Sequence, residues 1–263
     1  MSSSRPDSSA GTGPDLVGRP LREFRLAGYE LLRLARPELF ANPAGAAYEI
    51  VFDPELQERV ARESADRLRA AGRPGHYADL GVVYQDDFML LVRDAIRFRS
   101  GRLGTYTRLI PAVDELTGGS AVLARYADRT VLVRSFRHSS RNWHWEIPRG
   151  FGVAGESREQ TARRELEEEI GVRVLGIEPL GPLRMEIGMV GDPPQLFWAE
   201  VSEPSFLEQE EGLDDVLLAT PADLDRLMTR GLLDDAFTLA AIAYARVRGL
   251  LPQPVPVGVG RSV

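Results

Sequence analysis

The sequence predicts a mixed α/β fold, with a larger second domain after a smaller N-terminal region. The periodic segments come in the order strands, a helix, strands and then two helices, without the regular alternation of a βαβ repeat. The chain has 263 residues, of which 43% are hydrophobic. That length and composition are enough for one large domain or two small ones, each with its own core.

Several classes of protein are excluded by composition. No stretch approaches the roughly 20 consecutive apolar residues of a transmembrane helix, so no membrane partner is expected. Residues 1–20 lack the apolar core of a signal peptide. Cysteine is absent, which removes disulfides and thiolate chemistry. A cytoplasmic location is the expectation that follows.

The N-terminal region is predicted to run to residue 103. Residues 1–20 are rich in Ser, Gly and Pro without periodicity, which predicts a disordered tail. Residues 21–103 are predicted to form an α+β region of unknown role, whose last strands pack on the second domain. Its predicted elements are a helix and a strand within 20–50, an amphipathic helix from Asp53-Pro54 to Gly72, and two strands within 81–101 that turn at 85–87.

The second domain is predicted over residues 104–250, followed by a flexible tail at 251–263. Two apolar runs around Ala127-Asp128 predict a β-hairpin, and a further strand follows at 143–150. A helix over 157–172 would end at Gly171, because glycine commonly terminates helices. The remaining predicted elements are strands at 182–190 and 195–201 and helices at 220–231 and 234–249.

Charge is unevenly distributed between the two parts. Residues 1–103 carry 15 Arg against 15 acidic residues, whereas residues 104–263 carry 17 Arg against 24 acidic residues, which accounts for the net charge of −7. An acidic second part argues against binding the phosphate backbone of nucleic acid. Clustered carboxylates instead suggest a metal ion.

The most informative segment is GFGVAGESREQTARRELEEEIGV, which runs from Gly150 to Val172. On a helix, Glu165 and Glu169 are four residues apart and share one face, and Glu168 lies beside them. Leu166 points to the other side, toward a core. The three acids therefore form one carboxylate cluster.

Such a cluster is costly without a cation. Like charges at this spacing repel and raise one another's pKa, and acids are disfavoured at the C-terminal end of a helix. Oxygen ligands without His or Cys favour Mg²⁺ or Mn²⁺ over zinc. A solvated acidic helix face is the alternative for a Glu run taken alone.

A second motif overlaps the same segment. Gly150, Gly152 and Gly155 spell G-x-G-x-x-G between a strand and a helix, which is a dinucleotide-binding fingerprint. We reject that interpretation because the preceding strand contains Glu146 and Pro148, which suit a central parallel strand poorly. No βαβ repeat follows it either.

The full spacing resembles the Nudix box: Gly, five residues, Glu, seven residues, then Arg-Glu-apolar-any-Glu-Glu-any-Gly-apolar. Every specified position matches, from Gly150 through Glu156 and Arg164 to Gly171 and Val172. Segments across about 80–250, including VLVRSFRHSSRNWHWEIPRG, are similar to ADP-ribose pyrophosphatases and related nucleoside-diphosphate-sugar hydrolases. The resemblance implies a Nudix-type mixed β-sheet sandwiched between helices.

The activity implied by this resemblance is metal-dependent hydrolysis of a nucleoside diphosphate derivative. An ADP-sugar such as ADP-ribose, cleaved to AMP and sugar phosphate, is the first expectation. The resemblance also implies a homodimer. Two alternatives stay open: a nucleotide-sugar sensor without turnover, and an interaction role in which residues 1–75 recruit a partner.

Roles of individual residues are likewise implied by the resemblance. Glu165 and Glu169 would bind the metal, and Glu168 would share a metal or activate water. The carbonyl of Arg149 would be a further metal ligand, and Arg164 would pair with Glu156 to orient the helix.

Other residues are expected to contact substrate or to assist catalysis. Arg137 would touch the diphosphate or a ribose, and Glu146 would lie near the substrate. The late acidic loop LEQEEGLDD would supply an extra catalytic carboxylate, with Glu211 as first choice and Glu210 as second. One departure concerns the stretch after the box, which lacks the proline-containing motif of many ADP-ribose pyrophosphatases and so leaves the substrate open.

Overall fold

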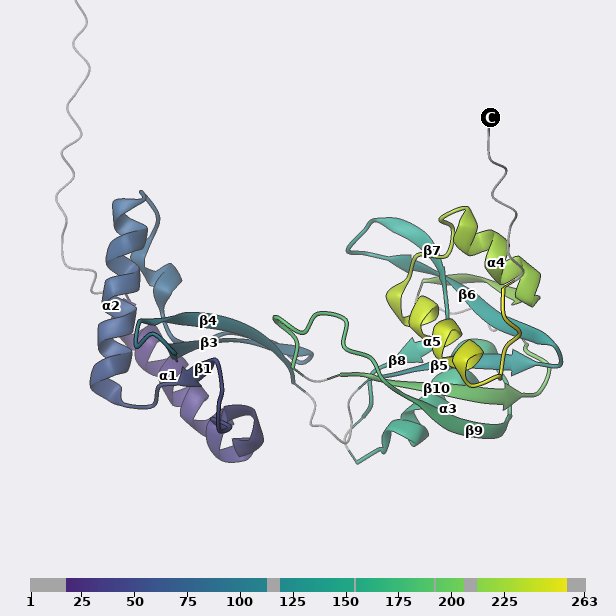
Figure 1. Cartoon of the computed structure of the whole chain (residues 1–263), viewed down its shortest axis with the longest axis horizontal. Helices are drawn as coiled ribbons and strands as arrows, with labels where there is room; N and C mark the ends of the chain where they lie inside the picture. The colour runs from purple at the N-terminus through teal and green to yellow at the C-terminus, as the bar shows by residue number, and fades with distance from the viewer. Residues whose placement is uncertain (1–17, 113–118, 154, 192, 206–211, 255–263) are drawn as a thin grey trace, which may run out of the picture. The chain divides into compact units, whose positions relative to one another are not determined.

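The computed structural model describes residues 18–112, 119–153, 155–191, 193–205 and 212–254, with only the backbone described for 18–20. The chain divides into two compact units between Leu109 and Ile110 (Figure 1). This point lies inside strand β4, Leu103–Pro111, in which the predicted division at residue 103 also falls. The predicted tails at 1–20 and 251–263 lie largely outside the described residues. A search of the described helices finds none with the length and apolarity to cross a bilayer.

The first unit is a small antiparallel sheet with two helices. Strand β3 is central and pairs with β1, β2 and β4. The elements are α1 Gly18–Ala35, β1 Tyr48–Ile50, α2 Pro54–Ala70, β2 Gly81–Gln85 and β3 Met89–Phe98, with short 3-10 turns at Pro37–Phe40 and Gly75–Ala78.

Local chemistry explains the two helices of this unit. Asp53 caps α2 by accepting a hydrogen bond from the Leu56 amide at 2.9 Å, as an N-cap aspartate does. Helix α1 is attached to the sheet by buried Tyr29, whose hydroxyl donates to Asp94 at 2.6 Å. Arg108 donates to the other oxygen of Asp94, also at 2.6 Å, so the buried carboxylate is paired on both sides.

The second unit contains a larger sheet in the order β11-β6-β5-β10-β9, with β7 beside β6 and β8 beside β5. Its elements are β5 Ser120–Tyr126, β6 Arg129–Arg137, β7 Asn142–Glu146, β8 Arg149–Gly150, α3 Arg158–Ile170, β9 Val174–Pro182, β10 Gln195–Val201, β11 Leu213–Ala219, α4 Pro221–Thr229 and α5 Ala236–Val247. Strands β5 and β10 run parallel and the other pairs antiparallel, so the predicted mixed sheet is confirmed.

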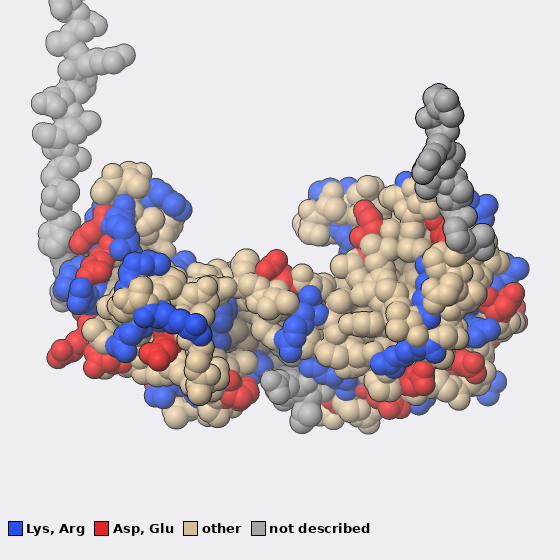
Figure 2. All heavy atoms as spheres, in the orientation of Figure 1, with Lys and Arg blue, Asp and Glu red and all other residues tan. Residues whose placement is uncertain are grey.

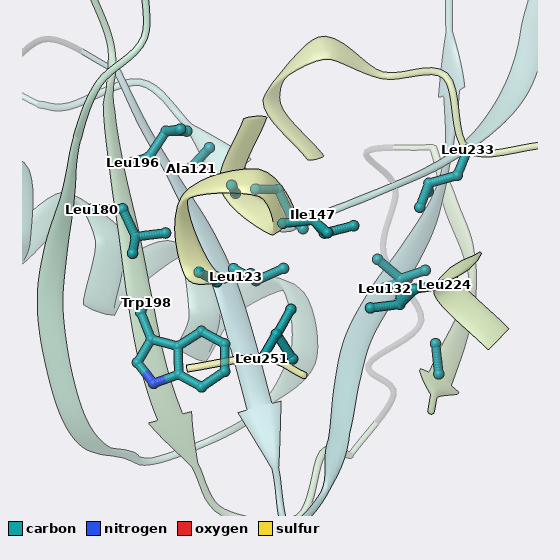
Figure 3. Close-up of a cluster of buried hydrophobic side chains, with 14 residues drawn as sticks. Ala121, Leu123, Leu132, Ile147, Leu180, Leu196, Trp198, Leu224, Leu233 and Leu251 are labelled. Carbon is teal, nitrogen blue, oxygen red and sulfur yellow. The ribbon is translucent and has the colours of Figure 1, made fainter. Parts of the chain in front are cut away.

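Helices cover both faces of this sheet, as alternation along β5 illustrates. Ala121 and Leu123 enter one core cluster together with Ile242 of α5 (Figure 3). Val122 enters the other cluster together with Leu166 of α3. Successive side chains on a strand point to opposite faces, so one apolar strand supplies both cores. The predicted sandwich of a sheet between helices is therefore confirmed.

Two sequence-based assignments in this unit are wrong. The segment 182–190, predicted as a strand, is largely irregular with a turn at 187–189, and the strand lies earlier, at β9. The acidic segment taken as a loop through Asp215 enters strand β11 at Leu213 and pairs with β6. Both errors have the same cause. The position of a strand depends on its pairing with strands distant in the sequence, which the local hydrophobic pattern does not reveal.

The visible surface carries both signs of charge on each unit. In Figure 2, arginine side chains and acidic side chains lie interspersed among uncharged ones on the face shown. Mixed charge of this kind is typical of a solvated protein surface.

Candidate active site on helix α3

Helix α3 carries the carboxylate cluster and has well-defined ends. Ser157 accepts a hydrogen bond from the Gln160 amide, and the Gln160 side chain accepts one from the Ser157 amide at 2.8 Å, which completes a capping box. Gly171 ends the helix in the left-handed conformation at φ 63°. Leu166 and Ile170 are fully buried against the sheet. These contacts fix the helix about its own axis, which directs its acids away from that core.

Strand β8, which contains the first glycine of the box, lies directly against Glu165, the first acid of the cluster. A β-carbon added at Gly150 would overlap the carboxylate of Glu165. Glycine at 150 is therefore required for the close approach of β8 to α3, rather than for a special φ angle. The Glu165 side chain is 12% exposed, which places its carboxylate at the contact between the two elements.

Glu169 is the most perturbed acid of the cluster. Its Oε2 atom is buried and has no hydrogen-bond partner. Burial, followed by repulsion from Glu165 and Glu146, raises the pKa of Glu169 to about 8, although a backbone hydrogen bond from Arg149 opposes the rise. A buried carboxylate oxygen without a donor is destabilised unless it binds a proton or a cation.

Arg164 connects the acids of the box. Its guanidinium donates to Glu156 at 3.0 Å, to Glu165 at 2.8 Å and to Glu168 at 2.7 Å. It also donates to the carbonyl of Phe151 at 2.9 Å. The predicted pair of Arg164 with Glu156 is thus present. These hydrogen bonds lower the pKa of Glu156 and raise that of Arg164, so both groups keep their charge.

The acidic face fits a hard divalent cation in its donor set. Among the residues that the structure describes, no three Asp, Glu or His side chains are already arranged as a metal cluster, and Glu165 and Glu168 contact Arg164 instead. Glu169 nevertheless presents a buried, unpartnered oxygen beside a second carboxylate. Carboxylate oxygens are the ligands that Mg²⁺ and Mn²⁺ prefer, and a cation would replace the proton that Glu169 otherwise holds.

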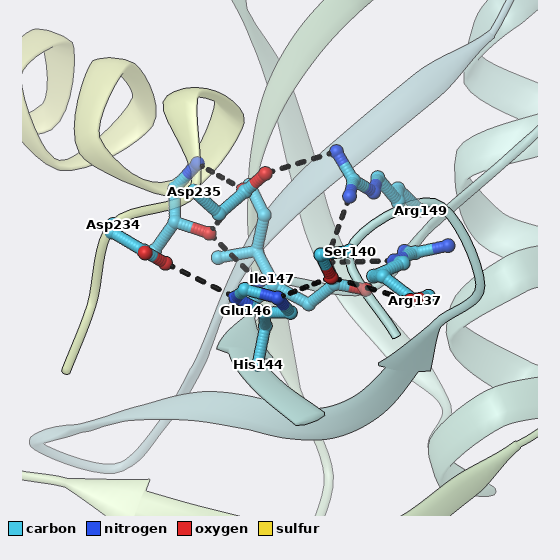
Figure 4. A network of polar contacts seen from close by, with 9 residues as sticks. Arg137, Ser140, His144, Glu146, Ile147, Arg149, Asp234 and Asp235 are labelled. Carbon is cyan, nitrogen blue, oxygen red and sulfur yellow. Dashed lines mark hydrogen bonds and ion pairs between the residues drawn. The ribbon is translucent and has the colours of Figure 1, made fainter. Parts of the chain in front are cut away.

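A second set of charged residues lies on the neighbouring strands (Figure 4). Glu146 on β7 is only 2% exposed and accepts hydrogen bonds from two arginines, Arg137 on β6 and Arg149 on β8, the latter at 2.7 Å. Arg137 keeps 40% of its side chain exposed. Arg137 and Glu146 both influence the pKa of Glu169, so the structure brings these predicted residues together with the acids of α3.

Asp235, which was not among the predicted site residues, also belongs to this network. Arg149 contacts Asp235 at 3.1 Å, and Asp235 is the N-cap of α5. An aspartate before an apolar helix is recognisable as a cap from the sequence. Its ion pair with a residue 86 positions earlier has no local signal.

Two groups of residues remain to be placed: the two glutamates predicted as the extra carboxylate, and two histidines near the site. Glu211 and Glu210, expected as the extra carboxylate, lie outside the described residues. His144 contacts Ser140 at 2.7 Å and Asp234 at 3.2 Å, and His138 contacts Arg141 at 2.7 Å. Each of these two histidines therefore has polar partners, as a structural or surface histidine would.

The sequence of this chain is similar to one protein family and to two characterised enzymes. The family described as the NUDIX domain matches residues 117–230. ADP-ribose pyrophosphatase from Bacillus subtilis (strain 168) is 32% identical over 140 residues, which are 51% of this chain and 75% of that protein. The CMP-5'-(N-acetyl-N-hydroxy-3-aminopropyl)phosphonate hydrolase of Streptomyces rubellomurinus (strain ATCC 31215) is 32% identical over 84 residues, which are 31% of this chain and 41% of that protein.

A solved structure described as an ADP compounds hydrolase has a similar fold. It aligns with a TM-score of 0.56 and 20% identity, and it covers 64% of this chain and 91% of its own. At that identity, the likeness concerns the fold alone.

Proposed function

The chain belongs to the Nudix family, and we propose that it hydrolyses the diphosphate linkage of an ADP-sugar, with ADP-ribose as first substrate and AMP and ribose 5-phosphate as products. The observation that carries this proposal is the acidic face of α3, where Glu169 keeps a buried oxygen without a partner beside Glu165. Nudix hydrolases generally use divalent metal ions, and this face is where the chain has ligands for one.

The choice of substrate is supported by the relatives. The relative of which the chain covers 75% is named for ADP-ribose. The second relative, matched over a shorter segment, is named for a CMP derivative, so the two relatives differ in the nucleoside. In this proposal, Arg137 binds a phosphate oxygen of the diphosphate. Its side chain, 40% exposed, suits that role, because arginine pairs well with phosphate.

The chemistry is attack of water on phosphorus, which adds the elements of water across the P–O–P bond. Bound divalent cations would lower the pKa of that water and neutralise charge on the diphosphate. Glu165 and Glu169 would hold them, together with the backbone carbonyl of Arg149. Glu168, whose side chain is 57% exposed, accepts the proton of the attacking water or shares a metal. Glu211 is the other candidate for that base.

Two residues of the network orient rather than react. Arg164 holds Glu165 and Glu168 in place on α3, which fixes the reacting geometry before substrate binds. Glu146 is too deeply buried to present its carboxylate to solvent, so we propose that it acts by orienting Arg137.

Further parts of the proposal rest on the resemblance and on composition. We propose Mg²⁺ or Mn²⁺ as the cation, because hard oxygen ligands suit both. A homodimer and a cytoplasmic location are proposed with it, as is the absence of a nucleic-acid partner. Residues 104–250 would be the catalytic domain.

A panel of nucleoside diphosphate derivatives tests this function. ADP-ribose, another ADP-sugar, NADH and a dinucleoside polyphosphate would be incubated with Mg²⁺ or Mn²⁺, and release of AMP or sugar phosphate would be followed. Turnover of ADP-ribose above the others supports the proposal. If no compound turns over with either metal, yet a nucleotide raises the melting temperature, the chain is a nucleotide-sugar sensor instead.

A further inference from the structure

Helix α5 begins with a residue that is connected to the candidate active site. Asp235 is 12% exposed and makes two kinds of contact. Its Oδ2 atom accepts hydrogen bonds from the amide of Thr238 at 2.9 Å and from the Thr238 hydroxyl at 2.7 Å. Its Oδ1 atom pairs with the guanidinium of Arg149 at 3.1 Å. One carboxylate therefore caps the helix and holds an arginine of β8 at the same time.

The same helix end is attached to the segment between β7 and β8 at two more points. The buried amide of Ile147 donates to the hydroxyl of Thr238 at 3.0 Å. The Arg149 guanidinium also lies over the ring of Phe237, 4.4 Å from its centre. Figure 4 shows Asp235, at the start of α5, beside Arg149 and Ile147. The start of α5 thus fixes the backbone from residue 146 to residue 149.

Arg149, which follows this segment, contacts a buried acid of the candidate site. The guanidinium of Arg149 donates to buried Glu146 at 2.7 Å, and Glu146 in turn pairs with Arg137. A displacement of Arg149 would therefore disturb the pair of Glu146 with Arg137.

We infer that Asp235 is a positioning residue of the active site, acting through Arg149 on Glu146 and, through it, on Arg137. It does not touch the reacting atoms. Groups that orient residues in direct contact with a metal or substrate typically change activity by about 10- to 100-fold when they are removed. This inference rests on the proposed hydrolysis for its kinetic readout, but not for its structural one.

The decisive variant is Asp235→Asn. Asparagine is as good an N-cap as aspartate, so the helix cap is retained, whereas the charge that holds Arg149 is lost. Asp53→Asn is the matched control, because Asp53 is an N-cap aspartate of α2 in the first unit. A role limited to capping predicts that the two variants behave alike.

The kinetic test uses the full-length protein with ADP-ribose and Mg²⁺. We expect Asp235→Asn to lower kcat by about 10-fold with little change in KM, because Arg149, whose backbone carbonyl would help to hold the metal, is no longer fixed in place. Asp53→Asn should retain wild-type kcat. In a double-mutant cycle, adding Asp235→Asn to Arg149→Gln should cost much less than it costs alone, since the two act through one contact. Equal kcat for the two aspartate variants, or fully additive losses, would overturn the inference.

A second readout does not depend on catalysis. Amide hydrogen exchange should be faster for the peptide spanning 146–150 in Asp235→Asn than in the wild type or in Asp53→Asn. If the wild type hydrolyses nothing, the proposed function fails and this exchange result alone decides the inference. If the wild type is active and exchange at 146–150 is unchanged in Asp235→Asn, the positioning role is wrong while the proposed function stands.

Discussion

Gly150 and Glu165 lie so close that the carboxylate of Glu165 occupies the space where a β-carbon of residue 150 would be. This contact joins β8 to α3 and connects the first glycine of the box to the first acid of the carboxylate cluster. The glycine therefore helps to set the geometry of the candidate site, in addition to being part of a sequence motif. It follows that the smallest possible side chain at 150 should displace Glu165.

The variant Gly150→Ala should show this displacement. We expect kcat for ADP-ribose to fall on the order of 100-fold, because small misplacement of a reacting group has large effects on rate. Gly176→Ala is a suitable control, since a β-carbon at Gly176 on β9 would meet no heavy atom within 4 Å. Wild-type kcat in Gly150→Ala would show that the contact is not needed for activity.

The raised pKa of Glu169 predicts an unusual pH dependence for the metal-free protein. Its pKa is about 8 in the folded chain, against an ordinary value of 4.5, so folding favours the protonated acid. The stabilisation is complete below pH 4.5 and is lost as the pH rises through about 8.

Glu169→Gln should remove this loss, because glutamine stays neutral. In EDTA, we expect the variant to melt roughly 2–6 °C above the wild type at pH 8.5, with a smaller difference at pH 5. Glu159→Gln, an exposed acid at the other end of α3, is the control. A difference that is the same at both pH values would contradict the raised pKa.

Substitution of Arg164 should lower activity far more than substitution of the neighbouring Arg163. It contacts Glu156, Glu165 and Glu168, whereas Arg163 pairs only with Glu159 among the ion pairs of the described residues. We expect Arg164→Ala to lower kcat/KM by about 10- to 100-fold. Arg163→Ala should change it by less than about twofold, because exposed ion pairs contribute little. Similar losses of kcat/KM in both variants would mean that Arg164 acts as an ordinary surface arginine and does not position the acids.

Glu146 should stabilise the fold as well as the site. It is 2% exposed and lies between the guanidinium groups of Arg137 and Arg149, so removing its charge leaves two cations facing each other. Glu146→Gln should lower the free energy of unfolding by about 1–3 kcal/mol in urea denaturation. Glu200→Gln, at an exposed position on β10, should leave it nearly unchanged. An unchanged value for Glu146→Gln would contradict this role.

The site could be predicted from the sequence to the extent that it is local. Helix α3, its end at Gly171 and the shared face of Glu165 and Glu169 all follow from helical spacing, which operates over one or two turns. The buried position of Leu166 follows from the same period. The positions of these residues on one helix therefore followed from spacing, whereas their roles came from the resemblance to the Nudix box and stay predictions.

Contacts between segments far apart in the chain could not be predicted from local sequence patterns. The pair of Arg149 with Asp235 joins β8 to α5, and no local pattern specifies which cap aspartate meets which arginine. Strand β9 was placed too late in the chain for a similar reason, because its position depends on pairing with β10. Register and long-range ion pairs are properties of the assembled sheet.

The most direct measurement is the initial rate of ADP-ribose hydrolysis in Mg²⁺ for the wild type, Glu169→Gln and Glu159→Gln. If the acids of α3 carry a metal-dependent reaction, the wild type and Glu159→Gln should release AMP at similar rates. Glu169→Gln should then lose at least about 100-fold of that activity. Wild-type activity in Glu169→Gln would show that hydrolysis does not depend on the acidic face of α3, and would contradict the site proposed for this chain.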